Sequence, residues 1–307
     1  MLAVVIGYGS IGQRHCRVLE EMGVTVSVVS RRAADGSGHH RQLADALTEQ
    51  TGYVVVANET ALHASTLSDL SALGWSGKTL VEKPLFSNTA DVPETLPAGP
   101  VYTGYNLRFL PVLQQLHALA RETRVLSIEA HCGQWLPDWR PGRDYRQTAS
   151  ASRQAGGGVL RDLSHELDYV CWLAGPWKRV FATGGRVSDL EIDVEDSVSL
   201  LIETEGCRQV AVSLNYLDRP AGRHVTLNTA SGTIRADLLT GKLTVNGEGS
   251  APISANDVAT TYQRLHQAIL HENGETVCTF EDALDVVHLI DAAEQSLDRD
   301  LAVHREH

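Results

Sequence analysis

Three short motifs combine residue types that could bind an anion and move a proton. A glycine-rich turn, GYGSIG, occupies residues 7–12, and the tripeptide Glu82-Lys83-Pro84 follows further along the chain. A third motif, GGGVLRDLSHELDY, contains Asp162 and His165. Glycine turns leave backbone N–H groups available to a phosphate, and lysine or histidine can transfer a proton at a reacting carbon. The combination points to proton-transfer chemistry beside a phosphate-bearing ligand.

The glycine turn lies between an expected strand and an expected helix. Residues 2–6 form a continuous apolar run, typical of a strand buried in a parallel sheet, and residues 13–22 form a helical stretch. The first glycine of such a turn permits tight bending, the second lets the backbone approach a pyrophosphate, and the third allows close helix–strand packing. We therefore predict a dinucleotide site. Its expected contacts here are Gly7, Gly9, Ser10, Ile11 and Gly12.

Strands and helices alternate up to residue 105, which predicts an α/β domain over residues 1–105 with a Rossmann, doubly wound parallel sheet. The further strands are expected at residues 24–29, 53–57, 79–81 and 101–105, and the helices at 42–50 and 61–73.

The pattern changes after a helix at residues 111–122. Short alternating strands separated by turn residues indicate a large, mostly antiparallel open sheet. The domain over residues 106–307 is therefore expected to be α+β. Its strands are predicted at 125–132, 179–184, 194–204, 207–216, 225–228, 233–237 and 242–245, and its last helices at 257–271 and 281–297.

The end of the second strand bears on the choice of cofactor. A site specific for NAD usually ends this strand with Asp or Glu, about 20 residues after the glycines, to bind the ribose hydroxyls. Here Ser30 occupies that place, and Arg31 and Arg32 follow. A hydroxyl and two guanidinium groups suit a 2′-phosphate. The sequence favours NADP, with NAD as the alternative if the arginines are only solvated surface residues.

In this order, the motifs resemble the Gfo/Idh/MocA family of nicotinamide-dependent oxidoreductases. In that family a lysine in such an EKP motif and a later histidine flank the hydride-transfer site, which implies catalytic roles for Lys83 and His165. The resemblance also implies a cis Lys83-Pro84 peptide and an aspartate before the histidine. Many members space this pair four apart, whereas Asp162 and His165 are three apart. That departure leaves the role of Asp162 open.

Two further segments bear on the same site. Residues 57–63 resemble the family's ATPxxxH segment, which implies cofactor contacts by Asn58 and His63, together with Glu82 and Lys83. A helix-cap or core histidine explains His63 equally well. Residues 159–173 read as one helix on which Asp162, His165 and Asp168 recur every three residues and so share a face.

The segment QWLPDWRPGRDYR, residues 134–146, is expected to be a binding loop. Its tryptophans could stack on a sugar or base ring, and its arginines, Arg143 among them, could pair with phosphate or carboxylate. Together with residues 104–111, it resembles a subgroup associated with bacterial surface-polysaccharide and nonulosonic-acid gene sets. A surface loop pinned by aromatics is the alternative. The expected substrate contacts are Asn106, Arg108, Trp135, Trp139, Arg140, Tyr145, Arg146 and Asp168.

Composition limits the other functional classes. The net charge of −12 argues against a nucleic-acid partner or an anionic-membrane surface. The five cysteines include no CxxC pair, so neither a disulfide framework nor a metal site is expected, and a cytoplasmic location fits best. No stretch approaches 18 uninterrupted apolar residues, and no signal peptide is expected.

The resulting hypothesis is an NADP(H)-dependent oxidoreductase acting on a sugar, amino sugar or sugar nucleotide. An imine or tetrapyrrole reductase of the same fold is one alternative, and a non-catalytic NADP-binding regulatory subunit is another. Because relatives of the family commonly pair through the antiparallel sheet, the resemblance implies a homodimer or homotetramer.

Overall fold

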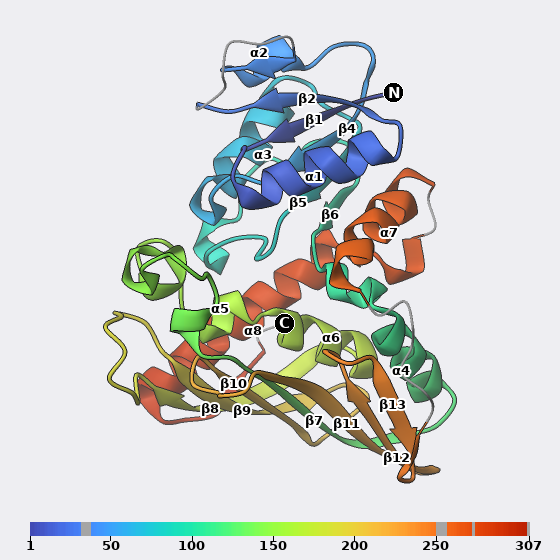
Figure 1. Cartoon of the computed structure of the whole chain (residues 1–307), viewed down its shortest axis with the longest axis vertical. Coiled ribbons are helices and arrows are strands. Elements are labelled where there is room, and N and C mark those ends of the chain that lie inside the picture. Colours follow the sequence, from blue (N-terminus) through green and yellow to red (C-terminus); the bar gives the residue numbers. More distant parts are fainter. Residues whose placement is uncertain (32–37, 250–256, 272–273, 306–307) are drawn as a thin grey trace. The chain divides into compact units, whose positions relative to one another are not determined.

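The computed structural model describes residues 1–31, 38–249, 257–271 and 274–305. The chain forms two compact units (Figure 1). The N-terminal unit comprises Met1–Phe109 and Val258–Leu284, and the C-terminal unit comprises Leu110–Asp257 and Asp285–His307. This division differs from the single boundary expected near residue 105, because a late segment of the chain returns to the N-terminal unit.

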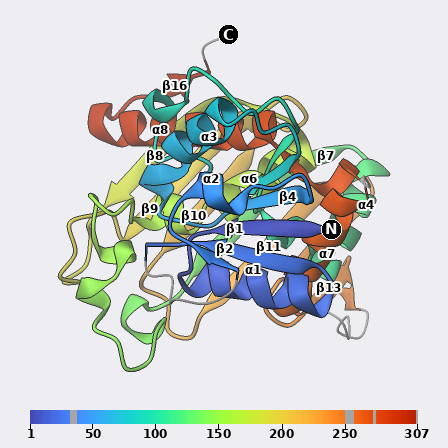
Figure 2. The same ribbon diagram turned by 90° about the horizontal axis from the view of Figure 1, so that it is seen from above.

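The N-terminal unit contains a seven-stranded sheet of order β15-β6-β5-β4-β1-β2-β3. All neighbouring strands pair in parallel except β15. Helices α1 and α3 lie on opposite faces of the sheet (Figure 2), so the expected doubly wound Rossmann fold is confirmed. The strands are β1 Leu2–Ile6, β2 Thr25–Val29, β3 His39–His40, β4 Thr51–Val56, β5 Lys78–Val81, β6 Val101–Thr103 and β15 Cys278–Thr279, and the helices α1 Ser10–Glu21, α2 Leu43–Ala46, α3 His63–Ala72 and α7 Val258–Leu270.

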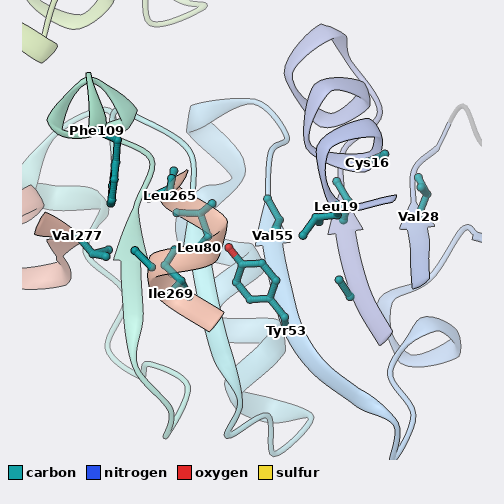
Figure 3. Packing of buried hydrophobic residues seen from close by; sticks show 13 residues of the cluster. Cys16, Leu19, Val28, Tyr53, Val55, Leu80, Phe109, Leu265, Ile269 and Val277 are labelled. Carbon is teal, nitrogen blue, oxygen red and sulfur yellow. The ribbon is translucent and has the colours of Figure 1, made fainter. Parts of the chain in front are cut away.

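Helix α7 completes the hydrophobic core of this unit. Its residues Leu265 and Ile269 are buried in one cluster with Val5, Tyr53 and Leu80 from the central strands (Figure 3). Burial of aliphatic side chains of this size typically contributes about 1.5–3 kcal/mol each. The assignment of residues 106–307 to a single second domain therefore needs correction. Hydrophobic packing, which depends on tertiary contacts, decides where α7 belongs.

The C-terminal unit is built on a nine-stranded sheet of order β14-β13-β12-β11-β7-β10-β9-β8-β16. The strands pair antiparallel except for β7 and β10, which are parallel, so the mostly antiparallel sheet is confirmed. The strands are β7 Val125–Gly133, β8 Trp177–Gly185, β9 Ser197–Thr204, β10 Val210–Asn215, β11 Gly222–Thr229, β12 Gly232–Asp237, β13 Lys242–Val245, β14 Glu248–Gly249 and β16 Val303–His304, and the helices α4 Pro111–Arg121, α5 Val159–Asp162 and α6 His165–Ala174. Helix α8, Phe280–Arg299, begins in the N-terminal unit and continues into the C-terminal unit from Asp285.

The single helix expected at residues 159–173 is wrong. Helix α5 ends at Asp162, Leu163 leaves the helical region at φ −102° and ψ 27°, and α6 begins at His165. Tertiary hydrogen bonds hold α5 at both ends. The amide of Leu160 donates to Glu195, and the carboxylate of Asp162 accepts from Tyr216. Asp162 and His165 therefore do not share the face of one helix.

One face of the large sheet carries a large exposed apolar side chain on β9. On β9, Val198, Leu200 and Ile202 are buried, while Leu201 between them is 60% exposed. Leu201 pairs across the strands with Phe181 and Ala211.

No helix within the described residues is long and apolar enough to cross a membrane.

We predict that the face of the large sheet that carries Leu201 mediates self-association, because large exposed apolar side chains often mark protein interfaces. Leu201→Arg should shift the protein toward a smaller species in light scattering at micromolar concentration. Leu239→Arg is the matched control, since Leu239 is 55% exposed in the turn after β12. A wild-type protein that is monomeric at this concentration would contradict the prediction.

Candidate functional site

The glycine turn requires glycine at two of its positions, Gly7 and Gly12. Gly7 has φ +99°, and a Cβ there would lie 2.5 Å from the carbonyl oxygen of Ala57. A Cβ on Gly12 would collide with the carbonyl of Gly7, whereas a Cβ on Gly9 would meet nothing within 4 Å. Helix α1 begins directly afterwards at Ser10. The turn therefore presents open backbone and a helix N-terminus, which suits a pyrophosphate.

A cavity of about 540 Å³ extends from this turn. It lies at the carboxyl ends of β1, β2, β4 and β5, where the strand order reverses and where ligands bind in doubly wound sheets. Most of the predicted cofactor contacts line it. Gly12 does not, and Arg32 lies outside the described residues. The predicted residues that line the cavity are Gly7, Gly9, Ser10, Ile11, Ser30, Arg31, Asn58, His63, Glu82 and Lys83.

The structure adds Arg41 to the cavity lining, beside Ser30 and Arg31. Arg41 directly follows β3, which pairs in parallel with β2. The carboxyl ends of these two strands therefore meet, and the amide of Ser30 donates to His40 at 3.0 Å. Sequence reasoning missed Arg41 because a two-residue strand gives no hydrophobic pattern. The sequence feature that could have indicated this contact is a basic residue directly after His39-His40.

The EKP motif places Lys83 on the wall of the same cavity. Its backbone amide donates to Glu82 Oε2 at 3.2 Å, and the Lys83–Pro84 peptide is cis, as the resemblance implied. Glu82 is only 9% exposed. Burial acts to raise the pKa of its carboxyl, but hydrogen bonds from His15 and from the Lys83 amide outweigh burial and lower that pKa. Glu82 is therefore a buried carboxylate next to the lysine.

His63 also lines the cavity, but its ring is held by backbone carbonyls. Its Nδ1 lies 3.0 Å from the oxygen of Leu85, and its Nε2 lies 3.3 Å from the oxygen of Asn58. Burial lowers its pKa, and a neutral imidazole donates from only one nitrogen. The shorter contact favours donation from Nδ1. His63 thus fixes the segment after Pro84, in keeping with the core-histidine interpretation.

The second candidate cluster lies in the C-terminal unit. His165, the first residue of α6, is half-buried, while the next five residues, 166–170, are buried. Asp162 accepts a hydrogen bond from the hydroxyl of Tyr216 at 2.7 Å. Burial and the nearby Asp162 carboxylate raise the pKa of Tyr216, which keeps its hydroxyl a donor. Tyr216 is a site residue without a sequence signal.

The glycines before α5 make room for a buried carboxyl group. Gly158 has φ +105°, and a Cβ there would collide with the side chain of Glu195. Burial raises the pKa of Glu195, which favours its protonated form. A Cβ on Gly157 would collide with the carbonyl of Ala149. The backbone therefore lies close to its neighbours at both glycines, and Glu195 reaches the start of α5.

Helix α6 is anchored by an ion pair directly after His165. The fully buried Glu166 accepts from Arg223 on β11 through both carboxylate oxygens, at 2.7 and 2.9 Å. Asp168, predicted to contact substrate, is 1% exposed. The arrangement holds the start of α6 to the sheet and leaves His165 as its more accessible titratable residue.

Many side chains of the expected binding loop are engaged within the C-terminal unit. The ring of Trp135 lies 3.3 Å from the Arg219 guanidinium, and Trp139 packs edge-on against Tyr216. The hydroxyl of Tyr145 accepts from the amide of Glu191 at 3.2 Å. Arg140 and Arg143 line a cavity of only about 10 Å³, which is too small for a sugar. These contacts pin the loop, so the surface-loop alternative stays open.

Arg146 is the most strongly paired arginine of this loop. Its guanidinium donates to both carboxylate oxygens of Asp144 and, at 2.6 Å, to Glu191. The hydrogen bonds from Arg146 lower the pKa of Asp144. A ligand carboxylate or phosphate would have to compete with both acidic partners for this guanidinium. Its predicted contact with substrate is therefore less favoured by the observed geometry.

Asn106 and Arg108, two further predicted substrate contacts, are buried inside the N-terminal unit. The amide of Asn106 donates to Thr261 of α7 at 2.6 Å. The guanidinium of Arg108 donates to Asp282 at the start of α8 at 2.9 Å. These bonds tie the turn after β6 to the returning segment. Lys83 and His165 belong to different units, so their joint action on one carbon stays a prediction.

Comparisons with known proteins bear on the whole chain. Residues 115–235 match the model of the GFO/IDH/MocA C-terminal domain family. No curated protein matches the sequence. GenD2 from gentamicin A biosynthesis, in complex with NAD, is 24% identical over 100% of this chain and 97% of that chain, with a TM-score of 0.78. Levoglucosan dehydrogenase, in complex with NADH, is 17% identical over 100% of this chain and 99% of that chain, with a TM-score of 0.82. The WlbA dehydrogenase of Bordetella pertussis, in complex with NADH and UDP-GlcNAcA, is 16% identical over 100% of this chain and 99% of that chain, with a TM-score of 0.77.

At these identities the solved structures establish a common fold rather than a common substrate. They span both units, and the family model covers much of the C-terminal unit. The sequence motifs, the two-sheet architecture and the family match agree with one another. The chain shares the fold of these solved structures, and its residues 115–235 match the GFO/IDH/MocA C-terminal domain family.

Proposed function

We propose that the protein is a nicotinamide-dependent oxidoreductase that acts on CH–OH or C=O groups of a carbohydrate-type substrate. The observation that carries this proposal is the cavity of about 540 Å³ that joins the glycine turn to Lys83. A dinucleotide-binding turn and a proton-bearing side chain on one cavity wall are what a hydride-transfer site requires.

The residues of this cavity fit a nicotinamide dinucleotide. The glycine turn offers backbone donors to the pyrophosphate, and Arg31 and Arg41 offer charge to a 2′-phosphate. When bound, the cofactor would supply or accept a hydride. Lys83 then has the role of moving a proton at its Nζ, because an ordinary lysine is protonated near pH 7 and can donate to a carbonyl oxygen. His165 is the second candidate for proton transfer.

The proposed substrate class rests on the family relatives. The named relatives are a gentamicin-pathway protein, a levoglucosan dehydrogenase and a WlbA dehydrogenase with UDP-GlcNAcA. A sugar, amino sugar or sugar nucleotide therefore has priority in a substrate screen that follows the absorbance of the reduced nicotinamide. If the protein oxidises or reduces no sugar, amino sugar or sugar nucleotide, the carbohydrate proposal is refuted. Turnover of an imine or tetrapyrrole would favour the alternative enzyme, and cofactor binding without any turnover would favour a regulatory subunit.

We predict that NADPH binds more tightly than NADH and that Arg31→Ala and Arg41→Ala each weaken NADPH binding. Hydrogen bonds to charged groups contribute about 1.5–3 kcal/mol, so each loss should be about tenfold or more in Kd. NADH binding should change little, because NADH lacks the 2′-phosphate. Fluorescence titration with both cofactors measures the difference.

Arg208→Ala is the matched control for these arginine variants, since its side chain is 90% exposed in the C-terminal unit. It should leave both affinities unchanged. Equal affinities of the wild-type protein for NADPH and NADH would overturn the NADP assignment and favour NAD, the cofactor form present in the named solved relatives.

A further inference from the structure

Four buried side chains form a continuous hydrogen-bonded chain that ends beside Lys83. Glu82 Oε1 lies 2.8 Å from His15 Nε2, His15 Nδ1 lies 2.9 Å from His266 Nε2, and His266 Nδ1 lies 3.0 Å from the hydroxyl of Tyr53. His15, His266 and Tyr53 are each 0% exposed. The chain links α1, α7, β4 and the end of β5 within the N-terminal unit.

The direction of the chain follows from the chemistry of its ends. Glu82 is held ionised by its lowered pKa, and an ionised carboxylate only accepts hydrogen bonds. His15 Nε2 must therefore donate. Burial, with the neighbouring His15, lowers the pKa of His266 well below its ordinary value, so this ring is neutral. Burial raises the pKa of Tyr53, which keeps its hydroxyl protonated.

One arrangement gives every hydrogen of the chain an acceptor. Tyr53 donates to His266 Nδ1, His266 donates from Nε2 to His15 Nδ1, and His15 donates from Nε2 to Glu82. In this arrangement both imidazoles donate from Nε2. An apolar core of the same shape would need no such matching of tautomers, and a buried polar group that lost its partner would destabilise the fold.

The surroundings of the chain are closely packed. Tyr262 of α7 packs edge-on against His15 at 5.4 Å between ring centroids, and the guanidinium of Arg14 covers the ring of Tyr262. On the other side, a Cβ on Gly104 would lie 2.9 Å from Glu82 Oε1, so the glycine leaves the space that the carboxylate occupies. Figure 3 shows Tyr53 at the α7 side of the sheet.

The far oxygen of Glu82 connects the chain to the cavity. Oε2 accepts from the backbone amide of Lys83 at 3.2 Å, and Lys83 lines the cavity. We propose that Tyr53, His266 and His15 are positioning residues, which fix the Glu82 carboxylate and thereby hold the backbone of Lys83 in place for proton transfer. The catalytic part of this inference rests on the proposed function. The positional part can be tested on the protein alone.

Lysine-selective ¹⁵N labelling provides that test, because the chain has only four lysines, Lys78, Lys83, Lys178 and Lys242. A Lys83→Arg variant assigns the Lys83 amide signal. His266→Asn retains a polar group near Nδ1 but loses the donor to His15, whereas His266→Gln retains a donor near Nε2. We expect His266→Asn to shift the Lys83 amide and His266→Gln to restore it toward the wild-type position.

Lys178 and Lys242 lie in the C-terminal unit and serve as internal controls. An unchanged Lys83 amide in His266→Asn would overturn the proposal, and so would equal shifts at Lys83 and Lys178, because they would indicate a general structural change. If His266→Asn does not fold, Tyr53→Phe takes its place. It removes only the terminal hydroxyl, and it should shift the Lys83 amide in the same assay. The absence of that shift would equally refute the proposal.

Histidine ring NMR and kinetics complete the experiment. Long-range ¹H–¹⁵N couplings should place the proton on Nε2 in both His15 and His266, and an Nδ1–H ring at either position would refute the chain. With a known substrate, His266→Asn should lower kcat about tenfold with an unchanged Kd for NADPH, and His266→Gln should stay within about threefold of wild type. Equal kcat values in both variants would overturn the positioning role. A wild-type protein without turnover would refute the proposed function but leave the amide test valid.

Discussion

Lys83→Ala and His165→Ala should each bind NADPH almost as tightly as the wild-type protein and turn substrate over about a hundredfold to ten-thousandfold more slowly, the usual cost of removing a general acid or base. We expect the glycine turn and the arginines that line the cavity to provide most of the cofactor affinity, and neither change alters them. Steady-state kinetics and NADPH titration of the same preparations separate the two effects. A fall in kcat with little change in the Kd of NADPH is the expected result.

Two exposed residues provide matched controls for these variants. Lys178→Ala and His304→Ala remove the same side-chain types from exposed positions of β8 and β16, and both should leave kcat unchanged. A near-normal kcat in Lys83→Ala would show that another group moves the proton. A near-normal kcat in His165→Ala alone would assign proton transfer to Lys83 and leave His165 without a catalytic role.

The Rossmann turn could be predicted because its requirements are local. Gly7 and Gly12 are fixed by positive φ or by contact with nearby backbone, and the apolar run before them is short and continuous. The return of α7 to the N-terminal unit could not be predicted. Its amphipathic pattern indicates a buried face but does not specify which sheet that face covers. The break between α5 and α6 likewise depends on contacts with Glu195 and Tyr216.

The same distinction holds within the candidate site. Sequence motifs predicted most of the cavity lining, because these residues follow strands whose carboxyl ends meet at one edge of the sheet. Tyr216 and His266 were missed, since each reaches its partners from an element distant in sequence, and Arg41 was missed because the two-residue strand before it gives no hydrophobic pattern. Arg146 shows the converse. Its position in a loop rich in arginine and tryptophan predicted a contact with an anionic ligand, but its guanidinium donates hydrogen bonds to Asp144 and Glu191.

The ion pair between Glu166 and Arg223 should contribute strongly to the stability of the C-terminal unit as long as both partners are present. Arg223→Met would leave the carboxylate of Glu166, which is 0% exposed, without its bidentate donor. Breaking a buried pair in this way typically costs about 3–5 kcal/mol of the free energy of unfolding. Urea unfolding followed by far-UV circular dichroism should therefore show a large fall in the midpoint.

The double variant Glu166→Leu/Arg223→Met distinguishes the charge from the packing. With both charges replaced by apolar groups of similar volume, the free energy of unfolding should return close to the wild-type value or exceed it. Arg179→Met is the control for an ion pair near the surface, because its partner Glu203 lies 3.5 Å away and its own side chain is 49% exposed; its cost should stay below about 1 kcal/mol. If Arg223→Met alone costs no more than this control, the pair does not anchor α6. In that case the position of His165 at the start of α6 must depend on the apolar packing of the helix instead.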